Sequence, residues 1–242
     1  MNFQGPLDFE TFSRIDFYAT PHKGLRRALY GASQAIAAAD PSDQAAVDTA
    51  LDLLHDTLKL VSRLGAVESV RIHAFLEALR PGATQAAQAD SERQTLAIGA
   101  LVQLEKEVRA ADRKERRELL ATLNSTYAGF VGEVLQHLYD AEMELMPLLR
   151  ETVSYEELNA IQRQIFADLG RDAFVALVRE IVPAVPSPER TEFLSTVQRC
   201  APSAVWPSIW WAVCALLSEN EQEDFTRLLG VDCARIGLGQ GF

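Results

Sequence analysis

His137 is the residue whose type and position point most directly to chemistry. It falls on the apolar stripe of a helix expected over residues 117–150, and an imidazole in apolar surroundings needs a hydrogen-bond partner, a metal ion or a polar cavity. At roughly 100° per residue, Glu133 and Glu144 lie nearest its azimuth and Glu142 lies about 140° away. Periodicity therefore does not select one carboxylate, and a core histidine satisfied by a neighbouring acid or by the backbone is an equal alternative.

Three earlier stretches carry residues of similar chemistry. His22 follows Pro21 near the start of the first expected helix, and Glu68 precedes His73 by five residues. The third stretch is Asp90 with Ser91.

The residue pattern predicts four long helices that would position these side chains. The first begins at Thr20 and Pro21, a hydroxyl cap followed by proline at the first helical position, and runs to Ala39. The others are expected over about 43–79, 84–110 and 117–150, with apolar residues at steps of three and four. No segment alternates as a strand would. The expected fold is all-α, an up-down four-helix bundle over residues 15–150.

A second helical region is expected over residues 154–230, packed on the bundle as an extension. Ser154 and Glu157 form a capping box for a helix over 155–169. Further helices are expected at about 172–181, 189–199, 206–217 and 221–229. All three tryptophans fall within 206–217, where helical spacing favours the core over a binding platform. His55 is expected on the surface or between helices, and residues 1–14 as an irregular lead-in.

Composition narrows the classes of partner. The 242 residues carry a net charge of -11, so the surface repels phosphate backbones and anionic membranes, and neither nucleic acid nor a membrane is expected as a partner. No run of 18 apolar residues and no secretory signal is present. The cysteines, Cys200, Cys214 and Cys233, are odd in number and lack metal-type spacing. We interpret them as unpaired thiols of a cytoplasmic protein.

Four segments resemble the ligand-bearing helices of the hemerythrin-like (HHE cation-binding) family. They are FYATPHKGLRRAL, ESVRIHAFLEALRPG, QADSERQT and FVGEVLQHLYDAEMELMP. The resemblance implies that His22 and His137 are nitrogen ligands and that Glu68 is the bridging glutamate. The family's second acid lies four or five residues after the last histidine, so Glu142 is implied because position 141 is alanine. The region 154–230 is similar to accessory helices of some members.

Other family positions differ in this chain. Leu64 stands where the family has a ligand histidine, Ser91 occupies another such place with Thr95 one turn on, and His73 matches a histidine that is usually not a ligand. Two irons would be under-coordinated by His22, Glu68, His137 and Glu142, whereas these four suit a single ion.

The resemblance implies a cytoplasmic protein with a degenerate site that binds one non-haem metal ion, iron before other divalent metals. Its expected role is sensing a small diatomic ligand, dioxygen or nitric oxide, or sensing or storing iron. The alternative is a metal-free interaction module with a vestigial site, whose interface is the tryptophan-rich segment or a homodimer seam. A third reading is a metal-dependent enzyme acting on a thiol or small molecule. No catalytic triad or dyad is apparent, so catalysis would depend on the metal.

Overall fold

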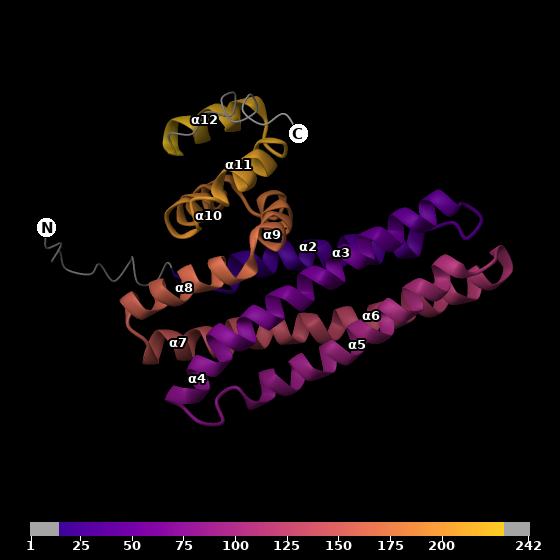
Figure 1. Cartoon of the computed structure of the whole chain (residues 1–242), viewed down its shortest axis with the longest axis horizontal. Helices are drawn as coiled ribbons and strands as arrows, with labels where there is room; N and C mark the ends of the chain where they lie inside the picture. Colours follow the sequence, from indigo (N-terminus) through magenta and orange to yellow (C-terminus); the bar gives the residue numbers. More distant parts are fainter. Residues whose placement is uncertain (1–14, 230–242) are drawn as a thin grey trace, which may run out of the picture.

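The computed structural model describes residues 15–229, and every regular element in that range is helical (Figure 1). The predicted all-α class is confirmed. Four long segments come first: α2 (Ala19–Ala38); α3 (Gln44–Glu68), continued by η1 (Ser69–His73) and α4 (Ala74–Leu79); α5 (Gln85–Ala110); and α6 (Arg113–Asp140), continued by η2 (Ala141–Leu145) and α7 (Met146–Thr152). Five shorter helices follow: α8 (Tyr155–Leu169), α9 (Arg171–Ala184), α10 (Ser187–Cys200), α11 (Trp206–Cys214) and α12 (Glu219–Leu229).

The long segments pack around a shared apolar core. Helix α2 contacts α3 and α6, and α5 contacts the same two helices from the other side. Leu29, Leu54, Leu101 and Leu123 are fully buried between them, and burial of a leucine side chain contributes about 1.5–3 kcal/mol. The buried Tyr127 hydroxyl donates to the Leu29 carbonyl at 3.2 Å, which ties α6 to α2.

Short polar residues decide where the helices begin. The carboxylate of Asp43 accepts from the first amides of α3, and that of Asp112 does so for α6, as N-caps do. Helix α6 therefore begins at Arg113, four residues before the predicted start. The expected cap at Thr20 is wrong, because Asp16 accepts from the amides of residues 18 and 19 at 2.8 Å. The Thr20 hydroxyl instead donates to Glu189.

Two π-helical turns interrupt segments that the pattern predicts as plain α-helices. In η1 the Ala74 amide donates to the Ser69 carbonyl, and in η2 the Met146 amide donates to the Ala141 carbonyl. These i→i+5 bonds insert one extra residue into a turn. Side chains five residues apart across such a turn come to lie near one another, and Glu68 and His73 have this spacing across η1.

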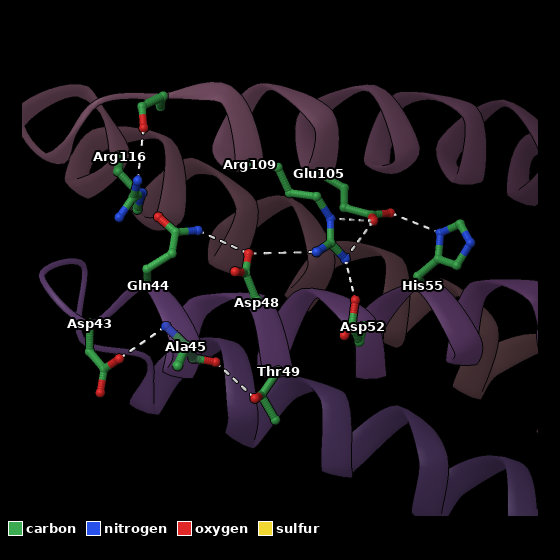
Figure 2. A network of polar contacts seen from close by, with 11 residues as sticks. Asp43, Gln44, Ala45, Asp48, Thr49, Asp52, His55, Glu105, Arg109 and Arg116 are labelled. Atoms are coloured by element: carbon green, nitrogen blue, oxygen red, sulfur yellow. Dashed lines mark hydrogen bonds and ion pairs between the residues drawn. The ribbon is translucent and has the colours of Figure 1, made fainter.

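A polar network joins α3 to α5 away from these turns (Figure 2). The Arg109 guanidinium lies 2.7 Å from Asp52 and 3.0 Å from Glu105. Glu105 also contacts His55 Nδ1 at 3.1 Å, which confirms His55 as an inter-helix residue. At about 1.5 Å per residue, His55 lies roughly 20 Å along the helix from Glu68, so the two belong to separate sites.

The later helices cover the α2–α3 side of the long segments (Figure 1). Helix α9 runs against α2, and α8 contacts α3 and η1. The predicted capping box of Ser154 and Glu157 is present. Trp210 is fully buried as predicted and stacks on the half-buried Trp206. The prediction that all the tryptophans belong to the core is wrong for Trp211, which is 59% exposed.

The remaining sequence predictions concern the cysteines, the two ends of the chain and a membrane span. Cys200 and Cys214 are half-buried, and neither forms a disulfide within the described range. Cys233, the expected lead-in 1–14 and the glycine-rich end 237–242 lie outside the described residues. None of the helices between residues 15 and 229 combines the length and hydropathy that a bilayer crossing requires.

The docking of α9 on α2 gives a first prediction. A Cβ added at Gly24 would lie 2.7 Å from an Ile181 side-chain carbon and 2.9 Å from its backbone nitrogen. We expect Gly24→Ala to destabilise the protein by about 1–3 kcal/mol through overpacking, measured by urea unfolding. Gly129→Ala is the matched control, because nothing lies within 4 Å of its added Cβ, and it should be neutral or stabilising by about 0.5–1 kcal/mol. Equal effects of the two changes would contradict close α2–α9 packing.

Candidate metal centre

Glu68 lies at the centre of the candidate site. It ends α3, and its side chain is 13% exposed. His73 Nε2 lies 3.6 Å from one carboxylate oxygen of Glu68, and His137 Nε2 lies 3.6 Å from the other. The carboxylate is therefore placed between two imidazoles, one from η1 and one from α6.

The π turn η1 explains why His73 faces Glu68. Five residues along a regular α-helix rotate a side chain by about 140° from its starting direction. Across an i→i+5 turn the same spacing nearly completes one turn, so Glu68 and His73 share a side. Helical periodicity alone does not reveal this pairing.

Charge is balanced tightly around Glu68. Burial by itself raises the pKa of the Glu68 carboxyl, but His137 and His73 outweigh burial and hold that pKa well below its usual range. Burial lowers the pKa of His137, and Glu68, followed by Asp90 and Asp140, reverses that effect and raises it. His137 Nδ1 lies 3.8 Å from Asp90 on α5, so this imidazole lies between two carboxylates.

Glu142 is paired with His22. Its Oε1 lies 2.9 Å from His22 Nδ1 and 2.9 Å from an Arg26 guanidinium nitrogen. Burial tends to raise the pKa of Glu142, but His22 and Arg26 outweigh it and lower that pKa. The structure thus joins η2 to α2 through a His22–Glu142–Arg26 cluster. Of the four predicted site residues, His137 pairs with Glu68 and His22 with Glu142.

A cavity of about 60 Å³ lies between the Glu68–His137 pair and His22 of the second cluster. His22, Glu68 and His137 all line it, together with Tyr18, Gln94 and Leu64. Leu64, where the resembled family has a histidine, thus borders this space. Ser91, at the other such place, does not line the cavity, and its hydroxyl donates to the Ala87 carbonyl within α5.

Several buried polar atoms around the cavity have no hydrogen-bond partner in the described part of the chain. They are the Tyr18 hydroxyl, His73 Nδ1 and Gln94 Nε2. Glu68 Oε1 and His73 Nε2 also lack a hydrogen bond, but they face each other at 3.6 Å as an ion pair. An unpaired buried polar group costs about 1–3 kcal/mol, and native structures usually satisfy such groups. Burial and the nearby charge of Glu68 raise the pKa of Tyr18 well above its usual value, so its hydroxyl is a neutral donor. The cluster has the composition of a ligand site.

The donors fit a metal ion only in pairs. Two ligand atoms that share one ion at about 2.1 Å lie roughly 3.0–3.6 Å apart, which matches each imidazole–carboxylate separation at Glu68. Between residues 15 and 229, however, no group of three or more His, Cys, Asp or Glu side chains is arranged to hold an ion. Coordination would therefore need a small convergence of side chains or added water ligands.

Sequence reasoning missed four residues of this site. His73 was expected not to be a ligand, and Tyr18, Arg26 and Gln94 were not predicted. Tyr18 and Arg26 lie one helical turn before and after His22, so i,i+4 spacing could have identified them. Gln94 carried no comparable signal. No protein family, no curated protein and no solved structure matches this chain.

The Glu68–His137 contact gives a second prediction, made for metal-free protein. Removing one member of a buried charge pair costs about 3–5 kcal/mol, whereas removing both costs less than the sum. We expect Glu68→Leu and His137→Leu, measured by urea unfolding in chelator, to show a coupling of about 1–3 kcal/mol. Glu156→Leu, at an exposed position, is the control. Its change in the free energy of unfolding should add to that of His137→Leu within about 0.5 kcal/mol. Additive effects at Glu68 would show that the two side chains act independently.

Proposed function

We propose that this chain is a hemerythrin-like four-helix bundle that binds one divalent metal ion, iron first, beside Glu68. One observation supports this most strongly. A buried carboxylate lies 3.6 Å from each of two imidazoles, at a cavity where neighbouring polar atoms are unpaired. A cation there would satisfy the lone pairs of Glu68 and the histidines together. Imidazole and carboxylate ligands suit iron, zinc and manganese.

The proposal assigns different roles to the two glutamates. Glu68 supplies oxygen, and His137, His73 and His22 supply nitrogen. Glu142 holds the Nδ1 side of His22 and leaves Nε2 for the ion, as carboxylates behind metal-bound histidines do. Arg26 balances the charge of Glu142. This extends the predicted set by His73 and makes Glu142 a positioning residue.

The surrounding side chains limit what could bind with the ion. A bound ion would supply an open coordination position for a small ligand. The cavity of about 60 Å³ suits a diatomic molecule such as dioxygen or nitric oxide. Tyr18 and Gln94 offer hydrogen-bond donors to it. The proposed role is ligand or iron sensing, or iron storage, in a cytoplasmic protein without nucleic-acid or membrane partners.

Metal binding is tested by elemental analysis of protein produced with iron and, separately, loaded with cobalt. We expect close to one ion per chain, and less than about 0.1 per chain after gentle purification would reject the proposal. Glu68→Gln should abolish binding. His55→Gln, a histidine change in the separate α3–α5 network, is the matched control and should leave binding intact.

Glu142→Gln separates a positioning residue from a ligand. Loss of a carboxylate behind a ligand weakens metal affinity about 10–100-fold and leaves the ligand count unchanged. We therefore expect Glu142→Gln to bind cobalt more weakly than the parent protein, with the same visible spectrum at saturation. A changed cobalt spectrum would place Glu142 in direct contact with the ion.

The alternative, a metal-free interaction module, is favoured by one surface feature. Trp211 and Leu216, on and just after α11, are 59% and 43% exposed, and exposed tryptophan is enriched at protein interfaces. This reading expects a homodimer that Trp211→Ser disrupts. A strictly monomeric mass by light scattering, for both the parent and the variant, would count against it.

A further inference from the structure

A groove of about 670 Å³ lies between the start of α2 and helices α8, α9 and α10. Its volume is within the range of roughly 300–1,000 Å³ that is usual for small-molecule sites. It is far larger than the cavity beside Glu68, so it accommodates a whole organic molecule. Aromatic side chains from different elements line it, among them Phe17, Phe166 and Phe193.

The groove and the cavity have a common wall. Phe17, Pro21, Leu64 and Ile165 line both spaces. All four are half-buried, so they are neither sealed in the core nor turned to bulk solvent. A molecule in the groove would therefore contact the same side chains that border the Glu68 site.

Helix α8 presents two unpaired amides to the groove. Asn159 and Gln162 are three residues apart, hence on the same helix face, and both line the groove. Gln162 is only 9% exposed. Among the described residues neither side-chain amide makes a hydrogen bond. Neither amide is among the fully buried atoms that lack a partner, so both face the open space of the groove and are available to a bound hydrogen-bonding group.

Two carboxylates that line the groove, Glu189 on α10 and Asp16 just before α2, by contrast, already have cationic partners. Glu189 lies 2.6 Å from Lys23, and Asp16 lies 3.0 Å from Arg150. The other charged side chains that line it, Glu192 and Arg199 on α10, are exposed and of opposite sign, so the lining carries no excess of either charge. The unpaired polar groups on α8 are neutral amides beside aromatic rings. This combination favours an uncharged ligand over an ionic one.

We propose that this groove binds a neutral amphipathic organic molecule. Its apolar or aromatic body packs against Phe166 and Phe193, its hydrogen-bonding group meets Asn159 and Gln162, and its inner end reaches the common wall. The binding site stands by itself. Its use as the route by which a substrate approaches the ion rests on the proposed function.

The test uses the full chain, stripped of metal, and the fluorescent probe N-phenyl-1-naphthylamine. We expect saturable binding at one site. Ser195→Phe, a half-buried groove position, should weaken binding at least about tenfold, equal to about 1.4 kcal/mol. Ser125→Phe places the same ring on the exposed face of α6 and should leave affinity unchanged.

A second pair of variants tests the amide. Gln162→Met keeps the side-chain length but removes the hydrogen-bonding group, and it should weaken the probe about three- to tenfold. Gln164→Met makes the same change on the exposed face of α8 and should have no effect. Circular dichroism confirms that each variant is folded.

The outcomes separate the two proposals. If the protein binds the probe but never takes up metal, the groove proposal is supported and the metal site is rejected. If the protein takes up metal but does not bind the probe, the metal site is supported and the groove proposal is rejected. Binding that Ser195→Phe leaves unchanged would overturn the groove assignment. A dimer in light scattering that Ser195→Phe abolishes would also overturn it, because a second copy would then fill the groove.

Discussion

The candidate site depends on the neutralisation of one buried carboxylate. A charged Glu68 inside apolar surroundings would be strongly unfavourable by itself. His73 and His137 approach it from two different elements and keep its pKa low. Asp90 and Asp140 act on His137 in turn, so charges of opposite sign alternate through the cluster. This balance links the end of α3 to α5 and α6.

The π turn η1 brings His73 to Glu68. A regular helix would direct His73 away from Glu68, and would equally separate the azimuths of His137 and Glu142. The extra residue in η1 rotates the helix beyond it, so His73 joins Glu68. Glu142 lies within η2 and meets His22 across the α2–η2 contact. π turns often occur at functional sites. They interrupt the regular i→i+4 hydrogen bonding and thereby change the direction in which the following side chains point.

The C-terminal helices change what the long segments can bind. Gly24 allows α9 to approach α2 closely, and α8 and α10 then enclose a groove against the start of α2. The same packing leaves Asn159 and Gln162 facing that groove. Without these helices the long segments would lose the larger space next to the Glu68 cluster. Accessory helices are therefore central to the proposed ligand chemistry.

The sequence by itself determined the helical class, most helix ranges and the capping box of Ser154 and Glu157, because these depend on local periodicity and short-range hydrogen bonds. The assignment of His22, Glu68, His137 and Glu142 to one metal site stays a prediction; the structure shows two pairs, His137 with Glu68 and His22 with Glu142. Which acid meets which imidazole was decided only by tertiary structure. The Glu68–His73 pair depends on the π turn η1, whereas the pairs of His137 with Glu68 and of His22 with Glu142 depend on contacts between distant helices. A repeat of three and four residues carries no information about either. The groove has the same origin, since its walls come from elements that are far apart in the chain and meet only after packing.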